Sequence, residues 1–229
     1  MSCRCHCLFP SASLSLLRLL WLVAACAIVL ASGVCLAAKH FAMPAAKAAK
    51  TYPAHDEHAN EAVTVALDPY DTTEKQGIFS VHYNEIGFMP IFVIVTNDGD
   101  QPVTLADSQP ELITADRTKI YPATEDDIDR RIARPPNAGP SPNRLPWPKK
   151  DKPAVSKEAQ EEIETSMFAA HAVEPHSSQV GFMFFDVAGI SSPLAGASFY
   201  LTGAHDAKGN ELMYFEVSLD KYLSAQGKP

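Results

Sequence analysis

The residues best suited to chemistry in this 229-residue chain are two histidines and two acids in the stretch His55-Asp-Glu-His58. Imidazole and carboxylate groups at this spacing can bind Zn²⁺ or Ni²⁺. The stretch lies within residues 39–60, which are rich in alanine, lysine and histidine and show no sustained apolar period. We therefore predict a flexible tether without a rigid scaffold for ligands, and no metal site. The alternative is a domain that binds a small ligand or a metal through His55 and His58, together with His82.

A second group of ligand-type residues is Cys3-Arg-Cys-His-Cys7, whose thiolates and imidazole suit a soft metal ion. It lies in an N-terminal targeting segment and outside any folded scaffold, so we expect no closed metal site there. All five cysteines lie in the first 35 residues, and residues 36–229 contain no Gly-x-Ser-x-Gly motif and no glycine-rich phosphate loop. Because nucleophilic catalysis needs a base held against serine or cysteine, we predict no catalytic residue, no cofactor and no enzyme activity.

The third candidate is Asn97-Asp98-Gly99-Asp100, because closely spaced acids around a glycine can form a calcium loop. A calcium loop of the EF-hand kind has glycine at its sixth position and glutamate at its twelfth, and the glycine here comes too early. The stretch lies between predicted strands at 89–96 and 101–105, and the continuous apolar run at 91–95 predicts that the first of them is covered on both faces. We therefore predict a hairpin turn in which Gly99 takes a positive φ and the strand at 101–105 pairs back on the preceding strand.

The first 38 residues have the pattern of a targeting segment. Residues 19–38 carry no charge, and Arg4 and Arg18 precede them. A basic region followed by an apolar region and small residues is typical of a secretory signal peptide, and about 20 apolar residues also suffice for an uncleaved membrane anchor. The stretch Val23-Ala-Ala-Cys26 resembles a bacterial lipobox, which would place a lipid on Cys26. Every alternative predicts export to the periplasm or cell envelope, with membrane contact only through residues 19–38.

The overall charge restricts the class of partner. The chain has a formal net charge of −8 at pH 7, and 46% of its residues are hydrophobic. A chain of this composition can form a globular core. Because an acidic surface repels phosphate backbones, we expect no nucleic-acid partner.

Alternating apolar residues predict a series of short strands within one domain at 61–222. The expected strands lie at 61–67, 78–83, 89–96 and 101–105, in a hairpin at 111–121, and at 178–187, 196–204 and 211–222. In the last of them, one face consists of Met213, Phe215, Val217 and Leu219. Residues 223–229 are predicted to form a tail.

Residues 124–170 change to a helical period and form the predicted insertion. Thr124 is expected to cap a first helix, whose acidic first turn and later Arg130, Arg131 and Arg134 suit the helix dipole. Ser156 is expected to cap a second helix that ends near residue 170, with its glutamates mostly facing water, namely Glu158, Glu161, Glu162 and Glu164. Between the helices, residues 135–153 contain seven prolines and Trp147, as in an extended polyproline-like loop. The sequence thus predicts an antiparallel β-sandwich with a helical, proline-rich insertion.

Four stretches resemble a known kind of domain. They are IFVIVTNDGDQPVTL from residue 91, PELITADRTKIYPA from 110, VEPHSSQVGFMFFDV from 173 and LTGAHDAKGNELMYFEV from 201. Their order is similar to that in telokin-like, immunoglobulin-fold domains of bacterial exported proteins and lipoproteins, which typically contain a V-x-N-x-G-x-x-P-V-x-L hairpin. His176 stands where glycine is usual in that family, and the helical insertion is longer than its pattern suggests. The resemblance covers about residues 61–220 and implies an immunoglobulin-like sandwich and an exported location, without an activity.

These observations predict an exported, non-catalytic interaction or structural module of the bacterial envelope. Sandwich edges and loops bind other proteins by strand addition or docking. The insertion, with its proline-rich segment and Trp147, is the most distinctive surface that the sequence offers. We therefore expect an envelope protein as partner and residues 135–153 as part of the contact.

Overall fold

The computed structural model describes residues 41–134 and 155–227 of the chain. The predicted signal peptide or anchor at 1–38, with Cys26, lies outside the described residues, and so does the proline-rich segment 135–153 with Trp147. Among the helices of the described part, none is long and apolar enough to cross a membrane.

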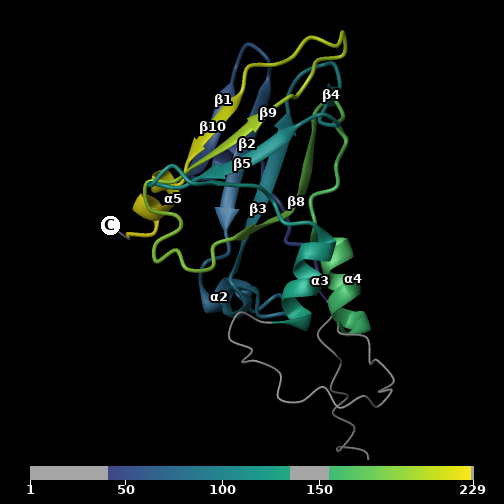
Figure 1. Cartoon of the computed structure of the whole chain (residues 1–229). Coiled ribbons are helices and arrows are strands. Elements are labelled where there is room, and N and C mark those ends of the chain that lie inside the picture. Colours follow the sequence, from purple (N-terminus) through teal and green to yellow (C-terminus); the bar gives the residue numbers. More distant parts are fainter. Residues whose placement is uncertain (1–40, 135–154, 228–229) are drawn as a thin grey trace, which may run out of the picture. The chain divides into compact units, whose positions relative to one another are not determined.

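Antiparallel strands form two four-stranded sheets (Figure 1). The first has the order β1-β2-β3-β8 and consists of β1 (Ala54–His58), β2 (Val63–Pro69), β3 (Phe88–Asn97) and β8 (Ser177–Asp186). The second has the order β10-β9-β5-β6 and consists of β10 (Phe215–Ser218), β9 (Ser198–Thr202), β5 (Gln109–Ile113) and β6 (Lys119–Ile120). A small sheet pairs β4 (Val103–Thr104) with β7 (Ala172–Val173). The predicted fold class, a mainly β antiparallel sandwich, is confirmed.

Strand β3 is buried on both faces, as its continuous apolar run predicts. One face contributes to the core between the two sheets through Met89, Ile91, Val93 and Val95. The other face contributes to a second core through Phe88, Phe92 and Ile94, which pack with side chains of the helices and of residues 41–83. The first sheet is therefore the middle of three layers.

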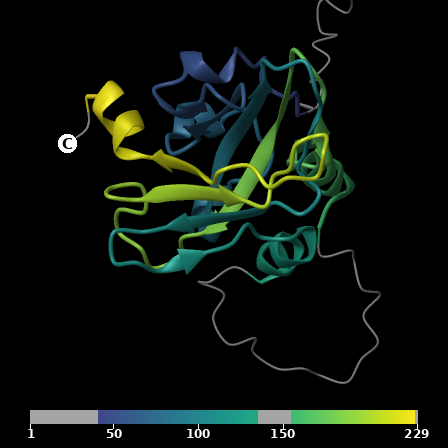
Figure 2. The same cartoon turned by 90° about the horizontal axis from the view of Figure 1, so that it is seen from above.

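The described residues also form four α-helices and two short 3₁₀ helices. They are η1 (Ala49–Thr51), α2 (Thr73–Gln76), η2 (Tyr83–Ile86), α3 (Glu125–Ala133), α4 (Lys157–Ser166) and α5 (Asp220–Ala225). Helices α2, α3 and α4 gather at one end of the sandwich, and both views place α5 on the opposite side from α3 and α4 (Figures 1 and 2). Helices α3 and α4 therefore form their own part of the molecular surface, away from α5.

Both predicted helix caps are confirmed, but α4 is shorter than expected. The hydroxyl of Ser156 accepts the backbone N–H of Ala159 at 3.1 Å. The helix ends at Ser166 instead of near residue 170, because Met167 is extended and the N–H of Phe168 donates to the Phe182 carbonyl at 2.9 Å. Pairing with β8 thus replaces the last helical turn.

The prediction of a flexible tether at 39–60 is wrong for its described part. Residues 54–58 form β1, which pairs along its whole length with β2. The side chains of Ala49 and Ala54 are fully buried, and the Phe41 ring stacks on Phe79 with 5.5 Å between centroids. The sequence shows no strand period here, because β1 is an edge strand whose polar side chains have partners within the fold.

The predicted hairpin at residues 97–100 is also wrong. Strand β4 pairs with β7 and not with β3, and Gly99 does not take a positive φ. The Asn97 side chain holds the turn instead, since its oxygen accepts the N–H of Gly99 at 2.9 Å and its amide donates to the carbonyls of Gln101 and Val173. A side-chain turn of this kind directs the chain away from the first sheet.

Two further strand predictions fail for local reasons. Residues 78–83 form no strand, because the N–H groups of Ser80 and Val81 donate to the Glu162 side chain and not to a neighbouring strand. The last strand starts only at Phe215, so Met213 is 66% exposed and does not join the buried face of β10. The predicted tail begins inside α5, in which Leu223 is buried.

Candidate functional site

The acidic and histidine residues of the His55–His58 stretch lie on β1, where they join the two sheets. The His58 ring stacks on Phe215 of β10 with 4.1 Å between centroids. Its Nδ1 lies 2.9 Å from Glu61 and its Nε2 lies 3.2 Å from Asp56. Each of these carboxylates also accepts a backbone N–H from the segment 213–216. The side chains therefore connect β1 to β10.

His55 and His82 do not form a site together with His58. His55 Nδ1 lies 2.6 Å from the Tyr52 carbonyl. His82 is exposed and directly precedes η2, which contacts β3. In the described part of the chain, no three or more histidine, cysteine, aspartate and glutamate side chains are grouped so that they could hold a metal ion. The alternative of a ligand or metal site at His55, His58 and His82 thus gains no support from their placement.

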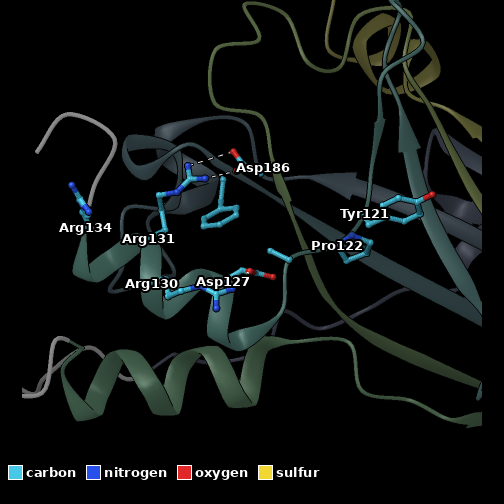
Figure 3. Close-up of a pocket in the computed structure, with 9 residues that line it drawn as sticks. Tyr121, Pro122, Asp127, Arg130, Arg131, Arg134 and Asp186 are labelled. Carbon is cyan, nitrogen blue, oxygen red and sulfur yellow. Dashed lines mark hydrogen bonds and ion pairs between the residues drawn. The ribbon is translucent and has the colours of Figure 1, made fainter.

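A more distinctive site lies beside α3, within the predicted insertion. It is a pocket of about 480 Å³ that is lined by Arg130 and Arg131 of this helix and by its C-cap residue Arg134 (Figure 3). The apolar part of its wall comes from Phe88 of β3 and from Pro122 and Ala123, which follow β6. Asp186, the last residue of β8, lies across from the helix. Four separate segments therefore build the pocket.

Helix α3 is fixed at its N-terminus and on one side. A capping box joins the two ends of its first turn: Thr124 Oγ1 accepts the N–H of Asp127 at 3.3 Å, and the Asp127 carboxylate accepts the N–H of Thr124 at 3.0 Å. The side chain of Ile128 is fully buried in the second core. These two constraints hold the later turns of the helix, with their arginines, against the pocket.

Arg131 is the most firmly held of the three arginines. Its guanidinium forms an ion pair with the Asp186 carboxylate and donates to the Ile86 carbonyl at 3.0 Å. It also lies over the Phe88 ring, with 5.0 Å between Cζ and the ring centroid, which adds a cation–π contact. Figure 3 shows this side chain pointing from α3 to Asp186. Arg131 therefore anchors the helix to the ends of β3 and β8.

Arg130 and Arg134 are much more available to a ligand. The Arg130 side chain is 72% exposed, although it forms an ion pair with Asp127 one turn earlier. Arg134 is exposed at the end of α3, and no hydrogen bond or ion pair within residues 41–134 and 155–227 involves its guanidinium. The guanidinium groups of Arg130 and Arg134 can thus donate hydrogen bonds to a ligand without any rearrangement of the fold.

The acid dependence of α3 can be predicted from its cap. Hydrogen bonds from the Thr124 hydroxyl and backbone N–H, together with Arg130, lower the pKa of Asp127 to about 2 from its ordinary value of 3.8. Because the folded pKa is the lower one, the carboxylate stabilises the fold above about pH 4, and this contribution is lost as the pH falls towards 2. We expect Asp127→Asn to reduce the acid-induced loss of helix in this window.

Circular dichroism against pH measures this effect. Asp126→Asn is the matched control, because Asp126 is exposed on the same turn and the described residues give its carboxylate no partner. The control should follow the wild-type acid profile. An Asp127→Asn profile identical to the wild type between pH 4 and 2 would contradict the role assigned to this carboxylate.

A second basic group, around Lys75, is structural. Its Nζ donates to Asp68 at 2.5 Å, to the Pro69 carbonyl at 2.9 Å and to the Tyr222 hydroxyl at 3.2 Å. The same ammonium lies 4.7 Å from the centroid of the Tyr222 ring. All three of its donors are used, and they connect α2 and β2 to α5.

Two features of this region were not predicted from the sequence. Glu162 was expected to face water, but its side chain is buried and accepts hydrogen bonds from residues about 80 positions earlier in the chain. The second feature is the pocket itself, because the sequence shows only that Arg130, Arg131 and Arg134 suit the negative end of the helix dipole. The sequence does contain one signal for them: Arg130 and Arg134 are four residues apart, which is the spacing of neighbours on a helix surface. The walls that turn this spacing into a pocket come from distant segments and leave no local signal.

No family model, no curated protein and no solved structure is significantly similar to this chain.

Proposed function

We propose that the protein is an exported, non-catalytic interaction module of the bacterial envelope, and that its helical insertion binds a partner protein for which both the pocket beside α3 and residues 135–153 are required. The observation that carries the proposal is the pocket beside α3, where exposed guanidinium groups stand next to an apolar wall. Arginine and aromatic side chains are enriched in protein interfaces. Tyr121, at the edge of the pocket, is 62% exposed, so an aromatic side chain is also available there.

We further infer an immunoglobulin-like connectivity for the sandwich. The order β2-β3-β8 corresponds to strands A, B and E of the immunoglobulin fold, and β10-β9-β5-β6 corresponds to G, F, C and C′. In this assignment β1 is an additional edge strand and the insertion lies between C′ and E. His176 has a φ of 52°, the left-handed conformation that glycine adopts most easily, and it occupies the position where telokin-like domains usually have glycine. Both observations support the resemblance.

The exported location is supported by the N-terminal sequence. An uncharged segment at 19–38 follows Arg18, and residues 36–229 contain no cysteine. The first feature is typical of a signal peptide or anchor. The second spares an exported domain from incorrect disulfides in an oxidising compartment.

Affinity capture from envelope extracts tests the proposal. With the full-length chain as bait, we expect the wild type to retain a specific protein, and a deletion of residues 135–153 to lower its recovery at least about tenfold. The control variant is Lys208→Ala, because Lys208 is an exposed residue in the turn between β9 and β10, far along the chain from the insertion. This control should retain the partner.

Two results would contradict the proposal. One is that the wild-type bait retains no protein beyond those retained by an empty matrix. The other is that the deletion variant, folded by circular dichroism, retains the same protein as well as the wild type does.

A further inference from the structure

We propose that the pocket beside α3 binds an oxyanion, and that its ligand is a carboxylate of an acidic, glutamate-containing segment of the partner. This inference rests on the proposed function and specifies the chemistry of the contact. Arginine presents a planar fork of N–H donors that matches a carboxylate with two parallel hydrogen bonds. The pocket provides such forks, because Arg130, Arg131 and Arg134 all line it.

The charge of the pocket favours a singly charged ligand. Its lining contains three arginines and two aspartates, so its formal net charge is +1. The chain as a whole has a formal net charge of −8, so the pocket carries the opposite sign to the chain. One carboxylate would neutralise the pocket. A phosphate dianion would leave an excess negative charge close to Asp127 and Asp186.

The three arginines have different roles in this arrangement. Arg131 is held by Asp186, by the Ile86 carbonyl and by the Phe88 ring, and it keeps the floor of the pocket in place. Arg130 is largely exposed and Arg134 is exposed one turn later, so both can donate to a bound carboxylate without breaking the anchor. These two residues are therefore the proposed ligand-binding groups.

The apolar wall explains why a glutamate side chain suits the pocket. Phe88, Pro122 and Ala123 line the same cavity as the two exposed arginines. A glutamate brings two methylene groups before its carboxylate, and burial of a methylene contributes about 0.8 kcal/mol. A free inorganic ion has no apolar group that could pack against this wall.

Direct titration of the full-length protein with defined ligands tests the inference. The probes are an end-capped, fluorescently labelled hexaglutamate peptide, the corresponding hexaglutamine peptide and inorganic phosphate, each at low ionic strength, where charge contacts are least screened. We expect hexaglutamate to bind and hexaglutamine not to bind. The double variant Arg130→Gln/Arg134→Gln should weaken hexaglutamate binding at least about tenfold, because two charge-assisted hydrogen-bonding groups are lost.

Arg117→Gln is the matched control. Arg117 is exposed in the turn between β5 and β6, and it undergoes the same chemical change outside the pocket. The affinity of the Arg117→Gln variant for hexaglutamate should stay within about twofold of the wild-type value. Thermal unfolding of all variants checks that the fold is kept.

Three outcomes would overturn the inference. Hexaglutamate and hexaglutamine binding equally well would exclude recognition of the carboxylate. Equal effects of the double variant and of Arg117→Gln would place the binding outside this pocket. Phosphate binding without hexaglutamate binding would identify free phosphate as the ligand.

If the double variant still captures the partner while the deletion of 135–153 does not, the proposed function stands and this inference fails. If hexaglutamate binds as expected but capture ignores the deletion, the proposed function fails.

Discussion

Replacement of Glu162 by alanine is expected to lower the free energy of unfolding by about 3 kcal/mol. The Glu162 side chain is 2% exposed and accepts the N–H of Ser80 at 2.5 Å, the N–H of Val81 at 3.2 Å and the hydroxyl of Tyr83 at 3.1 Å. A buried donor that loses its acceptor costs about 1–3 kcal/mol. The exposed Ser80 can regain a partner from water, whereas the fully buried Tyr83 hydroxyl cannot.

Urea denaturation measures this change, and Glu161→Ala provides the control. Glu161 is the preceding residue of α4, it is exposed, and alanine is an excellent helix former, so its replacement should change stability by less than about 0.5 kcal/mol. Equal stabilities of the Glu162→Ala and Glu161→Ala variants would contradict the structural role of this carboxyl group. The expected difference would also show that α4 organises the segment 80–83, on the side of the sandwich where the insertion lies.

Replacement of Phe182 by alanine should cost about 3–5 kcal/mol, the range for a large aromatic side chain removed from a core. Phe182 of β8 has no exposed surface, and it is the centre of an aromatic group in the second core. Its ring centroid lies 4.8 Å from that of Tyr70, 4.9 Å from that of Phe79 and 5.0 Å from that of Phe92. Alanine would leave a cavity and remove these ring contacts, of which those with Tyr70 and Phe79 are edge-to-face.

Tyr214→Ala is the corresponding control for an aromatic truncation at the surface. Tyr214 is 52% exposed, and its ring lies 6.2 Å from that of Tyr200. Its loss should cost less than about 1 kcal/mol. A cost for Phe182→Ala that is no larger than this would mean that the second core is not packed as described, and that the helical layer does not depend on it.

The features predicted correctly from the sequence are those whose signal is local. The continuous apolar run at 91–95 is typical of a strand buried on both faces, and β3 is one. Thr124 and Ser156 indicated helix caps, because the acceptors and donors of a cap lie within four residues of each other. The turn at Asp116-Arg117 joins β5 and β6 as expected, with Arg117 at a φ of 66°.

The features predicted wrongly depend on distant partners. Strand β1 has little apolar pattern of its own and is fixed by pairing with β2 and by His58 against Phe215. Strand β4 follows a turn that looks like a hairpin, but the Asn97 side chain and strand β7 determine its course. The arginines of α3 were visible as residues, whereas the pocket depends on Asp186 and Ile86, which lie 55 and 45 positions from Arg131.

Site-specific photo-crosslinking in the native envelope tests whether the surface of the insertion contacts a partner protein. A photoreactive amino acid is placed at Asp126, an exposed position on α3, and in a second variant at Lys208, an exposed position in the turn at the other end of the sandwich. We expect a discrete crosslinked protein from position 126 and none from position 208. A crosslink from position 208 without one from position 126 would show that the insertion is not the surface that contacts the partner.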